Sequence, residues 1–584
     1  MKVRLSLFFI LSIGLNHNSQ SQDIPASRTT DWTQPGSVSA FVPSVTVSLK
    51  DFGVDSTGII ACDQAFSRAL ASVQGAKRIK ISEGTFLFKQ PIILPDSVIL
   101  EGVADSQTNG IFTTLLLAAG ESHGIMANGS ESKTTATVVG PLVKDQMKIT
   151  LTSPAFKAGD FIRLSAMDDS LLVKSSWGIH TTGQIFQITK TDGNDIWLNK
   201  PLRRSYDANR LPEIFQINPK KQVHIRSLIL KTQLKSSFQT STIQFKYAAN
   251  CSVSGIESYM SNFAHVELSN STHITVEKSY FKDAFTYGNG GAGYGVVMQF
   301  TSGDCYIHSN VMEHLRHSIL LQAGANGNVT AYNYSFNPYW TGTFFPADAA
   351  GDLVLHGNYV YMNLFEGNVM QNIVIDNSHG INGPNNTFFR NRAESYGFVM
   401  NNNPASNGQN FVGNQVTSTA SLKGNFSLAG TNHFISGNTV KGTINAAGTG
   451  EPVAASLYNC TFSSFYSTYS SVPPIKTTNW QESKPLIEAQ YNFQNKGMNA
   501  VVTSVGNAEL SGGNVETESV YPNPFRNEIY VKGGDHKHFR IYDSQGVFVL
   551  FGDFNSKIET SQLKAGRYFI EGEGETHMMK VIKE

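Results

Sequence analysis

An asparagine recurs through the middle of the chain at a nearly constant interval, each time after a short apolar run. The copies are Asn310, Asn333, Asn368, Asn391, Asn414 and Asn438. All intervals but one are about 23 residues long, and one coil of a parallel β-helix uses about that many, so a repeat of this length indicates stacked coils. The repeat therefore predicts that most of the chain grows in one direction as a solenoid.

The chemistry of the amide side chain explains why asparagine would hold this position. Asparagine tolerates a left-handed backbone at a turn, and its side chain can bond to the same residue one coil above and below. We therefore expect the six asparagines to stack as a ladder, each in the left-handed conformation. Such a ladder would fix the register of every strand.

The one long interval, from Asn333 to Asn368, exceeds a coil by about a dozen residues. The excess falls in an aromatic-rich segment at 336–352, which we expect to leave the coil as a loop. Flat aromatic faces outside a solenoid suit stacking against sugar rings, which makes Tyr339 and Trp340 candidate substrate-binding residues. The open alternative is that the loop folds back and buries its own rings.

The N-terminus has the pattern of a secretory signal peptide over residues 1–22. Two cations precede a short apolar run, and a polar stretch begins at Asn16. The run is well below the roughly 20 apolar residues that a bilayer span needs, and no later segment comes closer. We expect an exported protein without a membrane anchor.

The overall composition excludes several classes of partner and site. The 45 basic and 45 acidic side chains cancel, so no overall field attracts nucleic acid or a membrane, although a local groove for a polyanion stays possible. The four cysteines are far apart in the sequence, which argues against a zinc site or a dense disulfide framework. Buried free thiols are the expected state.

The first coils resemble a known superfamily. Asp51-Phe-Gly, a helical pattern over the next residues, Ile81-Ser-Glu-Gly-Thr-Phe86 and Ile99-Leu-Glu-Gly102 follow one another in the order seen in pectate-lyase-type right-handed β-helix proteins. That superfamily includes polysaccharide lyases, glycoside hydrolases and phage tailspikes. The resemblance implies an all-β fold, a right-handed single-stranded parallel β-helix, with a short helix covering its open end. It is specific for the fold and weak for the reaction.

The remaining segments define further parts of the chain. We expect the cap and first coils at 45–134, a β-rich insertion of antiparallel strands packed on the side of the solenoid at 135–220, further coils at 221–499 and a linker at 500–520. The last part, beginning Tyr521-Pro-Asn-Pro-Phe and running to residue 584, reads as a small β-sandwich and resembles the C-terminal sorting domain of the type IX secretion system. That resemblance implies that the type IX machinery delivers the protein to the cell surface or the medium.

Chemically active side chains concentrate between residues 283 and 395, where the repeat brings coils into register. The candidate catalytic residues are His314, Arg316, His317, Asp376, His379 and Glu394. The candidate substrate-binding residues, besides the two loop aromatics, are His356, Asn382, Arg390 and Arg392. Counted from the ladder, His317 and Asp376 fall near the same place in their coils, and His356 lies one coil interval before His379. Each pair is therefore expected to be adjacent, because neighbouring coils are about 4.8 Å apart.

Three functions remain open on this evidence. A lyase would use His317 as the base that removes the proton α to a uronate carboxyl, with Arg316 binding that carboxyl. A glycoside hydrolase would pair Asp376 with Glu394 or Asp352. A glycan-binding adhesin would use the same groove without cleavage, and a lone histidine in a solenoid is more often a hydrogen-bonded turn residue than a catalyst. No cofactor is required; calcium, which assists many lyases of this superfamily, stays possible.

Overall fold

The computed structural model describes residues 23–37, 41–168, 175–288, 290–339, 351–458, 460, 462–468, 472–497, 499–501, 519–521, 527–532, 538–543, 548–553, 556–572 and 578–583. The predicted signal peptide, Trp340 and residues 502–518 of the predicted linker lie outside the described residues. The chain divides into two compact units, 1–503 and 504–584. Within the described residues, no helix is both long enough and apolar enough to cross a membrane.

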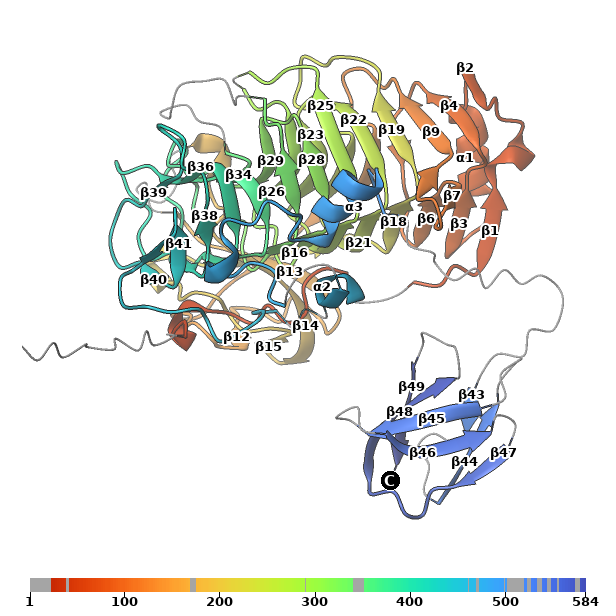
Figure 1. The fold of residues 1–584 in the computed structure, drawn as a ribbon. Helices are drawn as coiled ribbons and strands as arrows, with labels where there is room; N and C mark the ends of the chain where they lie inside the picture. Colours follow the sequence, from red (N-terminus) through yellow and green to blue (C-terminus); the bar gives the residue numbers. More distant parts are fainter. Residues whose placement is uncertain are drawn as a thin grey trace, which may run out of the picture. The chain divides into compact units, whose positions relative to one another are not determined.

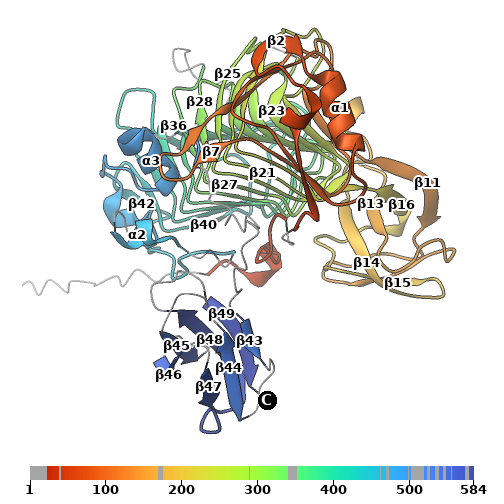
Figure 2. The same cartoon turned by 90° about the vertical axis from the view of Figure 1, so that its right-hand side faces the viewer.

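The first unit is a parallel β-helix whose coils each contribute strands to three faces (Figures 1 and 2). Face A is one sheet in which every neighbouring pair is parallel. Its strands are β1 (Val45–Ser48), β3 (Lys77–Lys80), β6 (Val98–Glu101), β18 (Val223–Arg226), β21 (Ala248–Ser254), β24 (Thr272–Glu277), β27 (Tyr306–His308), β30 (Val329–Ala331), β33 (Leu364–Glu366), β35 (Thr387–Phe389), β37 (Asn410–Val412) and β40 (Phe434–Ser436), with β17 (Lys220–Lys221) beside β21.

Faces B and C belong to one continuous sheet, because two long strands pass from one face to the other. These two are β34 (Val369–Ile375) and β36 (Arg392–Met400). Face B also holds β2 (Thr57–Ala61), β4 (Gly84–Phe88), β9 (Thr113–Leu117), β19 (Ile229–Thr232), β22 (Glu257–Ser261), β25 (Tyr280–Ala284), β28 (Val311–Glu313), β31 (Tyr334–Phe336), β38 (Gln415–Val416), β41 (Asn438–Val440) and β42 (Thr443–Asn445). Face C also holds β5 (Ile92–Ile93), β10 (Ile125–Asn128), β20 (Ile243–Lys246), β23 (Ala264–Ser269), β26 (Tyr294–Gln299), β29 (His317–Leu321), β32 (Leu353–Leu355) and β39 (Asn425–Ser427).

Apolar side chains from all three faces fill the interior as one continuous core. Identical positions of successive coils stack: the rings of Phe365, Phe388 and Phe411 follow one another at 4.9 and 5.2 Å between centroids. Three of the four cysteines, Cys62, Cys251 and Cys305, are buried free thiols, as predicted, and Cys460 is a half-buried one. The core is packed solid, so any binding site must lie on an outer surface.

The six asparagines stack as predicted, at the turn between faces A and B. Asn368 Nδ2 donates to Asn391 Oδ1 over 2.9 Å and to the Thr330 carbonyl of the preceding coil, and the Asn368 backbone N–H donates to the same Asn391 oxygen. The same bonds link every consecutive pair from Asn310 to Asn438. Every donor and acceptor of an internal ladder amide is thereby used.

One detail of the ladder prediction is wrong: the asparagines are not the left-handed residues. The positive φ belongs to the residue before each asparagine, such as Ser309 (55°), Tyr332 (54°) and Arg390 (52°), or to a glycine at 367, 413 and 437. The turn therefore places its strain one residue earlier, which leaves the asparagine side chain free to point inward. Gly367 packs against the Tyr332 ring, so a Cβ there would meet both strain and a close contact.

A second ladder, which the sequence analysis did not identify, lies at the turn between faces C and A. Asn328, Asn363, Asn386 and Gln409 are linked by Nδ2 to side-chain oxygen bonds of 2.9 Å. Each coil in this region is thus held at two of its three corners by buried amides.

The helix α1 (Asp63–Ala71) lies at the β1 end of the solenoid, as predicted (Figure 1). Its Phe66 and Ala69 are buried in the solenoid core, and Phe66 meets the Phe88 ring edge-on at 5.5 Å. The helix follows the short turn η2 (Leu49–Phe52), and a hairpin of β7 (Ala104–Asp105) and β8 (Gly110–Ile111) leaves a nearby coil. The helix covers the apolar end that the first coil would otherwise expose.

The β-rich insertion is an antiparallel six-stranded sheet with its own apolar core. Its order is β11 (Ser130–Thr137), β16 (Glu213–Asn218), β13 (Phe161–Ser165), β14 (Gln184–Asp192), β15 (Asp195–Leu198) and β12 (Lys148–Thr150), with the short turns η3 (Ser176–Gly178) and η4 (Ala208–Arg210). It packs against the side of the solenoid near the turn between faces C and A. There Arg203 pairs with Asp304, and Asn326 Nδ2 donates to the Gly183 carbonyl over 3.1 Å.

The expectation of coils as far as residue 499 is wrong, because regular coils end near residue 440. Residues 450–501, here called the C-terminal strap, run back along the outside of faces A and B. The strap carries α2 (Ser464–Thr468), η5 (Thr477–Asn479) and α3 (Glu488–Lys496). It starts where Glu451 pairs with Arg390 and ends where the Val501 N–H donates to the Lys278 carbonyl, several coils earlier. The aromatic side chains of this segment pack into a second apolar cluster and do not form further coils.

Residues 23–37 form a matching N-terminal strap that includes η1 (Ala26–Arg28). Arg28 donates to the Asn432 carbonyl over 2.6 Å, Trp32 Nε1 to the Met362 carbonyl, and the Gly36 N–H to the Asp304 carbonyl. The strap therefore crosses several coils in the direction opposite to their growth. The two straps tie coils together from outside, as the ladders do from within.

The second unit, described by itself, holds two antiparallel sheets. One contains β43 (Ser519–Tyr521), β44 (Glu528–Lys532) and β47 (Ser556–Glu559). The other contains β46 (Phe548–Asp553), β45 (His538–Asp543), β48 (Gly566–Gly572) and β49 (Met578–Lys583).

The ladder generates a stability prediction. Asn391→Ala removes the acceptor of two Asn368 donors and the side-chain donor to the Phe365 carbonyl, all in buried surroundings, and leaves Asn414 Oδ1 with only the backbone N–H of residue 391. Each orphaned buried group costs about 1–3 kcal/mol, so we expect the free energy of unfolding to fall by at least about 3 kcal/mol. Chemical denaturation followed by circular dichroism measures this loss. Asn425→Ala, at a half-buried asparagine with one local bond, is the control, and equal effects of the two variants would contradict the assigned role of the ladder.

The C-terminal strap generates a pH prediction. Burial raises the pKa of Glu366 to about 7, although the N–H of Leu457 and the hydroxyl groups of Ser456 and Tyr332 bond to its carboxyl. Because the folded value lies above the ordinary 4.5, the contribution of Glu366 is fully present below pH 4.5 and is lost as pH rises through 7.

The free energy of unfolding of Glu366→Gln should therefore be close to that of the wild type at pH 4.5. At pH 8 it should exceed the wild-type value by roughly 3 kcal/mol. Melting curves across this pH range measure the difference. The control is Glu482→Gln, at a half-buried glutamate of the C-terminal strap. A difference between Glu366→Gln and wild type that does not grow with pH would show that the buried carboxyl does not limit stability.

Candidate functional site

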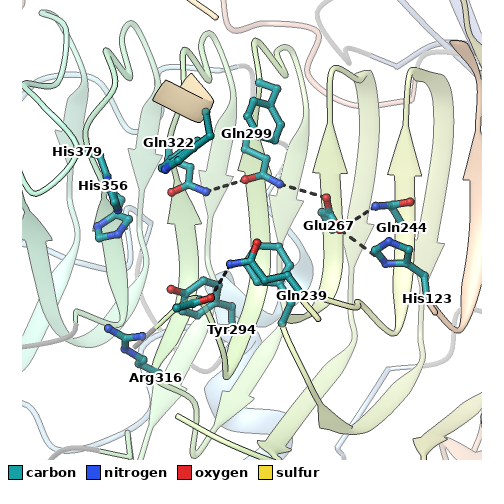
Figure 3. A pocket seen from close by; sticks show the side chains of 15 residues that line it. His123, Gln239, Gln244, Glu267, Tyr294, Gln299, Arg316, Gln322, His356 and His379 are labelled. Atoms are coloured by element: carbon teal, nitrogen blue, oxygen red, sulfur yellow. Dashed lines mark hydrogen bonds and ion pairs between the residues drawn. The ribbon is translucent and has the colours of Figure 1, made fainter. Parts of the chain in front are cut away.

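A groove of about 640 Å³ lies on the outside of face C, between the insertion and the loop that joins β25 to β26 (Figure 3). Its polar lining comes from side chains of successive coils and of the two flanking segments. These are His123, Gln239, Gln244, Glu267, Tyr294, Gln299, Arg316, Gln322, His356 and His379. Trp177, Phe263 and Phe300 add aromatic surface.

Strand register explains how the groove is assembled. Met298, Leu321, Leu355 and Ile375 are paired in turn along face C and point into the core. The next residues are therefore also in line, and they are Gln299, Gln322, His356 and Asp376. A row of polar side chains on successive coils thus runs parallel to the solenoid axis at about 4.8 Å per coil.

At one end of the groove a carboxylate is held by amides. Glu267 Oε2 accepts from Ser241 Oγ over 2.8 Å and from Gln244 Nε2 over 3.0 Å, and Glu267 Oε1 accepts from Gln299 Nε2 over 3.1 Å. Gln322 Nε2 donates to Gln299 Oε1 over 2.6 Å. His123 Nδ1 accepts from the Ser241 N–H, and burial lowers the pKa of this imidazole despite the nearby Glu267.

At the other end, imidazoles gather around one carboxylate. His356 Nδ1 donates to Asp376 Oδ2, and the His379 ring lies 4.5 Å from that of His356. Burial alone would raise the pKa of Asp376, but the bonds from His356 and Ser378 lower it below its ordinary value. The adjacency expected for His356 and His379 is thus present in the structure. His379 also meets Ser175 Oγ at 2.6 Å and the Trp177 ring at 5.0 Å, both from the insertion.

His317 lies behind this cluster and does not line the groove. It is 3% exposed, its Nδ1 donates to the Gly351 carbonyl over 3.0 Å, and its Nε2 is buried with no hydrogen-bond partner among the described residues. Burial, together with repulsion from His356 and Arg316, lowers its pKa to about 3. His356 stands between His317 and Asp376, with its ring 5.9 Å from that of His317. The direct pairing of His317 with Asp376 expected from the sequence is therefore replaced by a chain of three residues.

Arg316 supplies the guanidinium of the groove. It donates to the Gly288 carbonyl over 2.6 Å, and its guanidinium lies 6.0 Å from the centre of the Tyr294 ring. Burial raises the pKa of Tyr294, although Arg316 acts against this shift. The loop between β25 and β26, here called the glycine-rich loop, forms one wall of the groove through Gly290 and Gly291.

Two predicted residues belong to a separate cluster at the turn between faces B and C. His314 bonds to Asp283 Oδ1 at 2.7 Å, and the Tyr339 ring stacks on Tyr287 at 4.1 Å with 6° between the planes. The loop aromatic ring is thus half exposed and paired with another ring. Neither His314 nor Tyr339 lines the groove.

The predicted substrate role of Arg390 and Arg392 is wrong. Arg390 is 2% exposed and donates to the carbonyls of Pro452, Ala454 and Ile475, while Arg392 donates to that of Glu482. Both therefore hold the C-terminal strap. Both arginines follow the coil interval, but this periodicity does not show which other segment of the chain covers them.

Three other predicted residues lie outside the groove. Glu394 pairs with Arg392 at 3.1 Å, and burial raises its pKa. Asp352 is fully buried, with its pKa raised to about 7. Asn382 is buried behind His356 and Asp376, where it donates to the Asp376 carbonyl over 2.7 Å and accepts from the Gly357 N–H. Asn382 is thus a support for the imidazole cluster and not a surface ligand.

No group of three or more histidine, cysteine, aspartate or glutamate side chains is arranged to hold a metal ion in the part of the chain that the structure describes. The groove carboxylate Glu267 is already bonded to three donors, and Asp376 is bonded to His356 and Ser378. The oxygen-rich cluster that calcium needs is therefore not formed by these two residues.

The amide row was not predicted, although the sequence carries a signal for it. Gln244 and Glu267 are one coil interval apart, as are Gln299 and Gln322. A search for polar residues at the coil interval, and not only for histidine and arginine, would have found them. Trp177 had no such signal, because it reaches the groove from the insertion.

Comparisons with known proteins agree with these two units. Residues 519–584 match the family described as the Secretion system C-terminal sorting domain, which confirms the resemblance drawn from the sequence. No curated protein sequence matches the chain.

Among solved structures, the tailspike gp61 of Pseudomonas phage phi297 is similar in fold, with 11% identity over 68% of this chain and 74% of that chain and a TM-score of 0.52. An exopolygalacturonase from Thermotoga maritima (12% identity, 65% and 82%, TM-score 0.34) and the Streptococcus pneumoniae surface adhesin PfbA (12%, 67% and 84%, 0.34) also match. At these identities the likeness concerns the fold. The chain is therefore a parallel β-helix protein with a secretion-system sorting domain at its C-terminus, and it is secreted or held at the cell surface.

Proposed function

We propose that the protein is a polysaccharide lyase that cleaves a uronate-containing chain by β-elimination in the groove of face C. The observation that carries this proposal is the pairing of His356 with Asp376 at the end of the groove that Arg316 also lines. A β-elimination needs a base, a partner for the uronate carboxyl and a proton donor for the leaving oxygen.

His356 has the geometry of a general base. Its Nδ1–H is engaged by Asp376, so the lone pair of the neutral ring lies on Nε2. The carboxylate stabilises the imidazolium that forms when Nε2 accepts a proton. His317 cannot be reached from the groove as directly, and its low pKa keeps it neutral. We assign His317 to the packing that positions His356.

The remaining groups complete the reaction. Arg316 neutralises the uronate carboxyl, which makes the C5 proton removable and stabilises the enolate. His356 takes that proton, a double bond forms between C4 and C5, and the bond from C4 to the leaving oxygen breaks. The phenol of Tyr294, next to Arg316, donates a proton to that oxygen. His379 and Trp177 bound the site on the insertion side.

Carboxylate spacing argues against hydrolysis by an acid pair. Glu267 and Asp376 lie four coils apart, which at about 4.8 Å per coil is roughly 19 Å. Retaining and inverting hydrolases separate their two carboxyl groups by roughly 5 to 9.5 Å. Neither Glu394 nor Asp352 supplies a nearer partner, because Glu394 pairs with Arg392 outside the groove and Asp352 is fully buried.

Digestion of a panel of polysaccharides, followed by ultraviolet absorbance, tests the proposal. A lyase leaves an unsaturated uronate on each new non-reducing end, so absorbance rises with product. New chain ends without absorbance would indicate hydrolysis. Retention of a glycan with no new ends would indicate a binding protein.

Variants of the base sharpen the test. His356→Asn should lower kcat at least about 100-fold, because general-base catalysis contributes that much, while KM and the melting temperature stay near the wild-type values. His180→Asn, at an exposed histidine of the insertion, is the control. Wild-type turnover by His356→Asn would remove this residue from the mechanism.

A further inference from the structure

The two ends of the groove differ in charge and in hydrogen-bonding character. Glu267 is the one carboxylate among the groove-lining residues, and it stands with Gln244, Gln299 and Gln322 on neighbouring coils (Figure 3). Arg316, His356 and His379 line the other end. Glu267 and His356 are three coils apart, roughly 14 Å along the axis, so one sugar unit cannot occupy both ends.

Glu267 fixes which way the amides point. A carboxylate offers only acceptors, so Gln299 must turn its NH₂ group toward Glu267 and its oxygen away. That oxygen accepts from Gln322 Nε2, which leaves Gln322 Oε1 on the side of the His356 coil (Figure 3). On the other flank, Gln244 Nε2 donates to Glu267, and Gln244 Oε1 accepts from Asn128 Nδ2 over 2.7 Å.

This end of the groove therefore combines the negative charge of Glu267 with a row of amides. His123 Nδ1 lies 3.9 Å from Glu267 Oε2, but this nitrogen accepts from the Ser241 N–H, and burial together with the charge of Lys246 lowers the pKa of the ring, so the imidazole does not cancel the charge of Glu267. Lys246 itself is exposed and does not line the groove. Amides beside a carboxylate suit the hydroxyl groups of a neutral sugar, which both donate and accept hydrogen bonds. A uronate carboxylate placed here would face Glu267 with no bridging cation, and like charges in contact are strongly disfavoured.

We propose that the groove selects a polysaccharide in which uronate and neutral sugar units alternate. The uronate occupies the end formed by Arg316 and His356, and a neutral unit lies over Gln299 and Glu267. Glu267 acts as a specificity-determining residue through its own charge and through the amides that it orients. This inference rests on the proposed lyase activity and adds the substrate class to it.

The test compares two classes of polymer by the rate of unsaturated product formation. Polygalacturonate and alginate are homopolyuronates, whereas hyaluronan, unsulfated chondroitin and the rhamnogalacturonan backbone alternate a uronate with a neutral sugar. We expect the wild-type kcat/KM for at least one alternating polymer to exceed that for either homopolyuronate by at least about tenfold. An equal or reversed preference in the wild type overturns the inference and leaves the proposed function intact.

Glu267→Gln supplies a second readout, because it removes the charge and keeps the size of the side chain. The ratio of kcat/KM for the alternating polymer over the homopolyuronate should fall at least about tenfold, mainly through better use of the homopolyuronate. Glu257→Gln, on face B and outside the groove, should leave the ratio unchanged. A ratio unchanged in Glu267→Gln overturns the role of Glu267. If no polymer yields an unsaturated product, the proposed function and this inference are both overturned.

Discussion

Hydrogen bonds between buried amides determine the geometry on which the rest of the molecule depends. Each internal asparagine of the ladder joins its neighbours on both sides through its carbonyl, its NH₂ group and its backbone N–H. These bonds close only when consecutive coils have the same register. A slip of one residue would turn the outer row of face C into the core, and Gln322, His356 and Asp376 would no longer stand in line.

The two straps and the insertion determine which outer face is open to a ligand. The straps cover parts of faces A and B, where Arg390, Arg392 and Glu366 hold the C-terminal strap. The insertion packs at the turn between faces C and A and brings Trp177 to the groove. Face C is thus left with one wall from the insertion and one from the glycine-rich loop, which gives an otherwise flat sheet a groove.

The sequence predicted the features that recur at the coil interval, but not the contacts made by segments that do not repeat. The period of the asparagines predicted the coils and their stacking, and the same coil interval between His356 and His379 predicted that these two would be adjacent. Arg390 and Arg392 are in the same period but meet the strap, because contacts with a distant later segment leave no periodic signal. Residues 450–499 form a strap instead of the expected coils, and contacts of a non-repeating segment with the outside of earlier coils leave no periodic signal in the sequence. The amide row was missed because glutamine was not treated as a candidate ligand.

The most direct measurement is a crystal structure of an inactive variant, such as His356→Asn, with a bound uronate oligosaccharide. The account predicts a chain that follows the solenoid axis along face C, with a uronate carboxylate on Arg316 and its C5 facing the position of the His356 ring. A glycan bound elsewhere, for example on the stacked rings of Tyr287 and Tyr339 with the groove empty, would contradict it.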